Sequence, residues 1–214
     1  MIKSLLILLI LLFSACSTEP APNSWEYKSS SYFESYKKNF LSDNDILAEA
    51  DLESAVSYAK QGTDVTQLAS IYLGTCALNI AVGVEDSCKE YQDIEELVTC
   101  PKIKNYYKMI QKDFDNLDTE MLPARYRAFV IAMQQKNTEQ ANSIVQKMKD
   151  PISQLLEISL LVDAVTIETL QQAITSSSFH GYKKGSIFLL NKLEMKTNDL
   201  KEKELIRKKI ELLK

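Results

Sequence analysis

Apolar residues recur at every third or fourth position along most of the chain, which is the spacing that one face of an α-helix shows. A typical stretch holds Val65, Leu68, Tyr72, Cys76 and Ile80, which would all lie on the same side of one helix. The alternation typical of strands does not persist anywhere along the chain. The pattern predicts about eleven helices of roughly 10 to 18 residues each, joined by short loops.

Short loops between helices place neighbouring helices antiparallel. The 214 residues include only five Gly and five Pro, so residues that interrupt helices are scarce. We therefore predict an all-α fold of antiparallel helical hairpins, arranged either as an α-solenoid or as a compact helical bundle.

Polar residues, glycines and prolines mark where the predicted helices should begin and end. We expect a short acidic helix over residues 87–98 and a turn at the serine run 176–178. The other expected boundaries are Asp43, Asp64, Asn137, Asp150-Pro151 and Asn198-Asp199 as starts, Pro123 in a first turn, and Gly62 and Gly83 as stops.

One short motif is similar to a known helical repeat. Ile71-Tyr72-Leu73-Gly74 resembles the Leu-Gly pair in the first helix of tetratricopeptide-type repeats. The 34-residue consensus of Trp, Leu-Gly, Tyr, Ala and Pro does not follow, so the resemblance extends to hairpin architecture rather than to a defined repeat family.

The N-terminus has the composition of a secretion signal. Lys3 gives a positive start, residues 5–13 contain only Leu, Ile and Phe, and the small residues Ser14 and Ala15 precede Cys16. The apolar run is shorter than the roughly 20 residues that a membrane-spanning helix needs. We therefore predict a signal peptide over residues 1–15.

Phe13-Ser14-Ala15-Cys16 resembles the lipobox of bacterial lipoproteins, with Phe13 where Leu is usual. The resemblance implies that the chain is cut before Cys16 and that Cys16 is acylated and anchored in the bilayer. Acyl chains hold a protein at a membrane because each buried methylene contributes about 0.8 kcal/mol. Ser17, rather than Asp, follows the cysteine, which by the same resemblance favours the outer membrane, facing the periplasm.

Residues 16–24 have the composition of a tether, with two prolines and no large apolar side chain. We expect a flexible segment there, followed by a single all-helical domain over residues 25–214.

Charge is unevenly distributed. Residues 41–98 carry twelve acidic side chains against two lysines, whereas residues 183–214 carry ten basic against five acidic side chains. Such asymmetry either steers a partner or reflects solvated helix faces. Secretion and the lack of a basic-aromatic platform argue against nucleic acid.

Three cysteines remain once Cys16 is acylated, so one of them cannot pair within the chain. Cys76 lies on an apolar helix stripe and Cys88 opens the next segment, which favours a Cys76–Cys88 disulfide. Cys88–Cys100 is the alternative. Twelve-residue spacings without a nearby His do not favour a metal site.

Residues for catalysis are few. The single histidine, His180, has no acidic partner at a readable spacing, and no phosphate-binding glycine loop is present. Carboxylates are plentiful over residues 43–96 and leave open a cell-wall hydrolase, although their positions fit solvated helix faces. We expect no cofactor and no catalytic activity.

An aromatic stripe marks the first helix. Its spacing fits either a buried core face or a surface that docks a partner. Its members are Trp25, Tyr32, Phe33, Tyr36 and Phe40.

These features together predict a membrane-anchored periplasmic lipoprotein that acts as a non-enzymatic scaffold and binds another envelope protein. The alternatives are a cell-wall hydrolase that uses carboxylates in 43–96, and a carrier of a small ligand or lipid.

Overall fold

The computed structural model describes residues 24–63 and 65–214, and these contain eleven α-helices, four short 3-10 turns and no strand. The prediction of an all-α fold is thus confirmed. The helices are α2 (Ser24–Leu41), α3 (Asp45–Ala59), α4 (Thr66–Ala81), α5 (Lys89–Gln92), α6 (Pro101–Ile110), α7 (Ala124–Gln134), α8 (Thr138–Gln146), α9 (Pro151–Leu161), α10 (Ile167–Phe179), α11 (Lys183–Lys196) and α12 (Leu200–Leu213).

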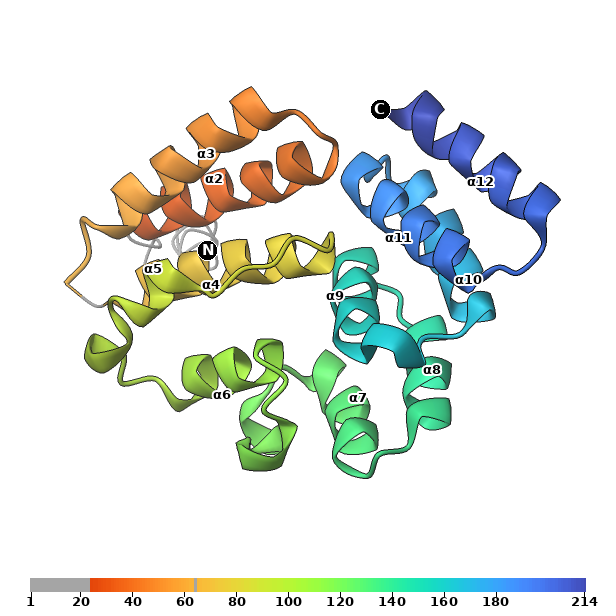
Figure 1. The fold of residues 1–214 in the computed structure, drawn as a ribbon. Helices are drawn as coiled ribbons and strands as arrows, with labels where there is room; N and C mark the ends of the chain where they lie inside the picture. The colour runs from red at the N-terminus through yellow and green to blue at the C-terminus, as the bar shows by residue number, and fades with distance from the viewer. Residues whose placement is uncertain (1–23, 64) are drawn as a thin grey trace, which may run out of the picture.

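The helices form hairpins around two central helices (Figure 1). Helices α2 and α3 pair along their length, and α7 with α8 and α10 with α11 form further pairs. Helices α4 and α9 pack against each other; α4 also contacts α2, α3, α5 and α6, and α9 also contacts α7, α8 and α10. The chain curves round until α11 reaches α2, so its second half returns to its first.

The helices are 4 to 18 residues long. Packing of apolar faces holds them, because isolated helices shorter than about 12–15 residues are marginal in water. One large cluster of buried side chains runs from Tyr36 in α2 to Ile210 in α12. A smaller cluster lies between α3 and α4 and consists of Ala55, Ala59, Leu68 and Ile71.

Helix boundaries in the second half follow the sequence predictions. The side chains of Asn137, Asp150 and Asp199 each accept a hydrogen bond from a backbone N–H of the helix that follows. Pro123 immediately precedes α7. In the first half, Gly83 ends α4 in the left-handed conformation, with φ +80°.

Two boundary predictions in the first half are wrong. Asp43 does not cap α3: its backbone is left-handed, with φ +66°, and its carboxylate pairs with Lys183 at 2.7 Å. Gly62 does not end α3, which stops at Ala59. Glycine is needed there because a Cβ atom would lie 2.6 Å from the Trp25 ring.

The predicted helix over 87–98 is shorter than expected. Cys88 has φ +58°, so α5 cannot begin before Lys89, and a 3-10 turn follows over Glu95–Leu97. The predicted turn at 176–178 is also wrong. Ser177 is buried within α10, and its Oγ would lie 2.8 Å from a Cβ at Gly185, so both small residues let α10 and α11 approach closely.

Two sets of predictions lie outside the described residues. The signal, Cys16 and most of the tether fall within residues 1–23, and the expected cap Asp64 is the other position outside. Helix α2 begins at Ser24, one residue before the predicted start of the domain. Across the described helices, none is long and apolar enough to cross a bilayer.

Candidate binding groove

The described part of the chain contains a groove of about 620 Å³. Its walls come from α2, α4, α6, α7, α9 and the turn before α7, so segments far apart in the sequence build it together. This volume lies within the range of about 300–1,000 Å³ typical of ligand sites.

The floor of the groove is the apolar side of α4. Leu73, Ala77 and Leu78 line it, and Leu156 of α9 continues it. Gly74 also lines the floor. The Phe33 ring of α2 lies directly against Gly74, and a Cβ atom at this position would lie 2.5 Å from Phe33 Cζ. Gly74 of the Leu-Gly pair therefore serves a close contact between two helices.

One wall holds a connected set of polar side chains. Ser153 donates from its Oγ to the Asp150 carboxylate at 2.5 Å, and its Oγ lies 3.0 Å from the Tyr126 hydroxyl. Tyr126 in turn hydrogen-bonds to Tyr106, whose ring centroid lies 5.8 Å from its own. Burial raises the pKa of both tyrosines, most strongly for Tyr106, so both are neutral phenols.

The rim of the groove is cationic. Four basic side chains line it, against one acidic side chain, Asp150. The four come from three different helices and are Lys37 of α2, Lys102 of α6, and Arg125 and Arg127 of α7.

The ion pairs of these basic groups lie at the surface. Arg125 contacts the Asp150 carboxylate at 3.2 Å, with the two side chains 55% and 39% exposed. Lys37 pairs with Glu34 and Arg127 with Glu120, and neither glutamate lines the groove. Exposed pairs of this kind contribute about 0–1 kcal/mol, so a ligand could replace that of Arg125 at little cost. Arg127 is held more firmly, because its guanidinium also donates to the carbonyl oxygens of Leu122 and Glu120 at 3.0 and 2.9 Å.

The carboxylates considered for a hydrolase do not gather at this groove, since no acidic residue of 43–96 lines it. Asp43 and Asp45 instead pair with Lys183 and Lys184 of α11. Part of the charge asymmetry is therefore used within the molecule, where the acidic start of α3 meets the basic start of α11.

His180 follows α10 directly. Its Nδ1 lies 2.9 Å from the Ser176 carbonyl oxygen, and its ring lies between those of Phe179 and Tyr182. The side chain is exposed and does not line the groove.

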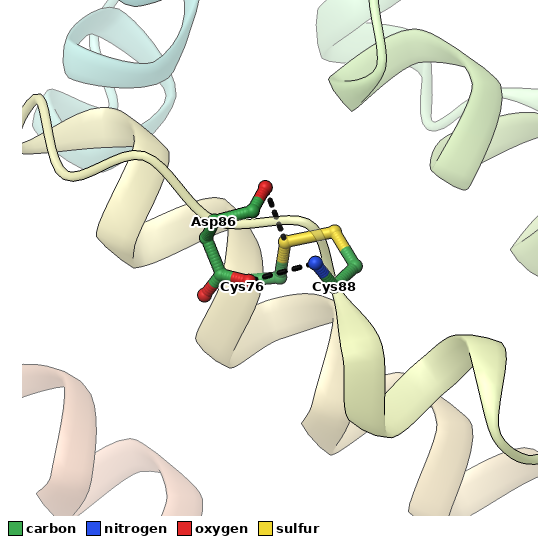
Figure 2. Close-up of side chains that lie close together, drawn as sticks. All are labelled: Cys76, Asp86 and Cys88. Atoms are coloured by element: carbon green, nitrogen blue, oxygen red, sulfur yellow. Dashed lines mark hydrogen bonds between the residues drawn. A yellow bond between two sulfur atoms is a disulfide. The ribbon is translucent and has the colours of Figure 1, made fainter.

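The structure brings Cys76 and Cys88 to disulfide distance, with their Cα atoms 5.2 Å apart (Figure 2). Asp86, in the loop between them, accepts from the Cys88 backbone N–H at 2.7 Å and from the Asn79 side-chain amide at 2.7 Å. Both sulfurs are buried, and Cys100 is half-buried and unpaired. The alternative Cys88–Cys100 pair is not formed.

Cys76, Asp86 and Cys88 are also arranged closely enough to resemble a set of metal ligands. One donor atom each from Cys76, Asp86 and Cys88 lies within 4.8 Å of the others. A disulfide leaves neither sulfur as a thiolate, however, so the oxidised protein has no soft ligand to offer a metal here.

The aromatic stripe of α2 is used mainly for packing. Tyr36 is buried, Phe33 fills the space above Gly74, and Trp25 lies on Gly62. Tyr32 stacks on Tyr58 of α3 with 5.6 Å between ring centroids. The ammonium group of Lys184 lies over the Phe40 ring, 4.2 Å from its centroid, in a cation–π contact. These contacts match the core interpretation for most of the stripe, whereas Phe33 also lines the groove.

Of the residues that line the groove, the sequence identified only Phe33 as a candidate for partner docking. Lys102, Arg125 and Arg127 have no motif, and only the fold places them around one apolar floor. No protein-family model, curated protein or solved structure matches this chain.

Proposed function

We propose that this protein is a lipid-anchored protein of the bacterial cell envelope that binds a segment of another envelope protein and has no catalytic role of its own. Acyl chains on Cys16 would hold it at the membrane. The helical body would then present its groove within reach of partners at the same membrane, which raises their effective concentration.

The observation that carries this proposal is the groove itself. It combines an apolar floor with a cationic rim and opens to solvent at the exposed residues Lys102, Ala124 and Arg125. Stacked helical hairpins commonly bind extended segments or helices of partner proteins in such grooves.

A hydrolase receives less support from this geometry. Glycoside hydrolysis requires two carboxyl groups that face the scissile bond. The groove has one, Asp150, which already accepts the backbone N–H and the hydroxyl of Ser153.

A small-ligand carrier is the second candidate. The apolar floor and the volume of about 620 Å³ would fit an amphiphilic molecule. The two candidates predict different results: a carrier should be isolated with a bound small molecule, whereas a protein-binding scaffold should not.

Two measurements test the proposal. Mass spectrometry of the mature protein from a bacterial host should find acyl chains on the N-terminal cysteine and cleavage before it. Cys100→Ser should remain in the membrane fraction, whereas Cys16→Ala should not. An unmodified Cys16 would contradict the anchor.

A photo-crosslinking residue in place of Ala124 should then capture a defined envelope protein in cells. The same residue in place of exposed Ser178 on α10 is the control. Equal capture from both positions, or from neither, would contradict a role of the groove in partner binding.

A further inference from the structure

The charges around the groove indicate what it binds. We propose that the groove takes an acidic segment of a partner protein, with carboxylates at its rim and apolar side chains against α4. This inference rests on the proposed function and adds the chemistry of the bound segment.

The charge of the groove lining complements that of an anionic partner. Four basic side chains and one acidic side chain line the groove, in a chain whose formal net charge is −4. Glu34 and Glu120 pair with Lys37 and Arg127 from outside the lining, so four basic side chains stand against three carboxylates and the groove keeps a small positive excess on a protein that is negative as a whole. A positive groove attracts an anionic partner and disfavours a basic one.

Basic side chains at the groove are available to contact the carboxylates of a partner. Within the described residues, Lys102 makes no ion pair or side-chain hydrogen bond. The pair of Arg125 with Asp150 is exposed and weak. Arg127 is less available, because its guanidinium also donates to the carbonyl oxygens of Leu122 and Glu120. An arriving carboxylate can form a bidentate contact with a guanidinium, which is stronger and more specific than a lysine contact.

The positions of the basic side chains bear on the kind of anionic partner. The basic side chains come from three helices that border the groove, α2, α6 and α7. Cations contributed by three helices suit several carboxylates of one chain better than a single lipid headgroup.

The floor of the groove is apolar and requires apolar side chains in the bound segment. Leu73, Ala77, Leu78 and Leu156 provide apolar surface beneath the charged rim. A purely acidic stretch would leave that surface uncovered. The expected segment therefore carries apolar residues between its acidic ones.

The test uses the full mature protein, purified from membranes in a neutral detergent. The probe is a fluorescent ten-residue peptide of alternating Glu and Leu, compared with one of alternating Lys and Leu. Fluorescence anisotropy should show saturable binding of the acidic peptide that weakens as salt rises. The basic peptide should bind at least tenfold more weakly.

Charge-reversing variants localise the binding. Lys102→Glu with Arg125→Glu should weaken binding of the acidic peptide at least tenfold. The matched control reverses two exposed cations of α12, Lys201→Glu with Lys208→Glu, and should change it less than twofold. Because all four side chains are exposed, circular dichroism should show native helix content in both variants.

Three outcomes would overturn the inference: equal binding of the two peptides, full affinity in the groove variant, or displacement of the acidic peptide from the groove by an anionic phospholipid added to the detergent micelles. Failure here does not remove the proposed function. If crosslinking at Ala124 still captures an envelope protein while no acidic peptide binds, the partner is of different chemistry. If neither occurs, both proposals fail.

Discussion

Among helices α3 to α12, side-chain caps occur only in the second half of the molecule, where α7 and α11 alone lack one. In the second half, α8, α9, α10 and α12 each start at a residue whose side chain accepts a backbone N–H of the first turn. These capping residues are Asn137, Asp150, Thr166 and Asp199. In the first half, α3, α4, α5 and α6 have no such bond.

The first half is held by contacts between distant residues instead. Trp25 lies on Gly62, Phe33 lies on Gly74, and Cys76 is joined to Cys88. Local capping can be recognised in the sequence because its partners lie three residues apart. Contacts of the first half join residues 12 to 41 positions apart, so they exist only once the helices have packed.

The largest expected effect comes from the disulfide. Cys76→Ala with Cys88→Ala should lower the free energy of unfolding by about 3 kcal/mol, since a link across about twelve residues restricts the unfolded chain by this amount. Urea unfolding under oxidising conditions measures the loss. Cys100→Ser is the control and should change little. An unchanged midpoint in the double variant would show that packing alone holds the first half.

Glu157 lowers the stability of the second half at neutral pH. It is buried in α9 with neither carboxylate oxygen hydrogen-bonded, and burial raises its pKa to about 9. The folded state therefore binds a proton that the unfolded state, with a pKa near 4.5, releases. Stability from this group is complete below pH 4.5 and declines as the pH rises towards 9.

Between pH 5 and pH 8, this group should lower stability by roughly 2 kcal/mol, from the linkage of about 1.4 kcal/mol per pH unit discounted for relaxation. Glu157→Gln should flatten that decline in chemical denaturation series at several pH values. Glu168→Gln, at an exposed position of α10, is the matched control. A Glu157→Gln protein with the original pH dependence would rule out Glu157 as its source.

Gly74 tests the aromatic contacts of the first half. Gly74→Ala should destabilise the protein by about 1–2 kcal/mol, because the new Cβ would displace the Phe33 ring. Phe33→Leu should relieve that conflict, so a double-mutant cycle should give a favourable coupling of about 1 kcal/mol. Additive effects of the two changes would mean that ring and glycine do not constrain each other.

Helix caps test the comparison most directly. Asp199→Ala should cost about 1 kcal/mol, because it leaves the N–H groups of Lys201 and Glu202 without their acceptor. Asn44→Ala, before α3, should cost only a few tenths, since Asn44 forms no side-chain cap bond. Thermal unfolding of both variants measures the difference, and equal losses would contradict the contrast between the halves.

The sequence by itself determined the all-α class, the approximate number of helices and most helix starts of the second half. It could do so because helical periodicity and capping are local: residues three or four apart meet on a helix whatever the remaining chain does. It also identified Cys76 and Cys88 as the preferred pair, since both lie near one end of the same predicted turn.

Only the tertiary structure decided how the halves meet and what they enclose. Asp43, expected to cap α3, instead pairs with Lys183, 140 positions away. The groove brings Lys37 and Lys102 together with Arg125 over an α4 floor. None of these residues is marked by its neighbours in sequence, because their positions in space depend on how the connecting helices pack.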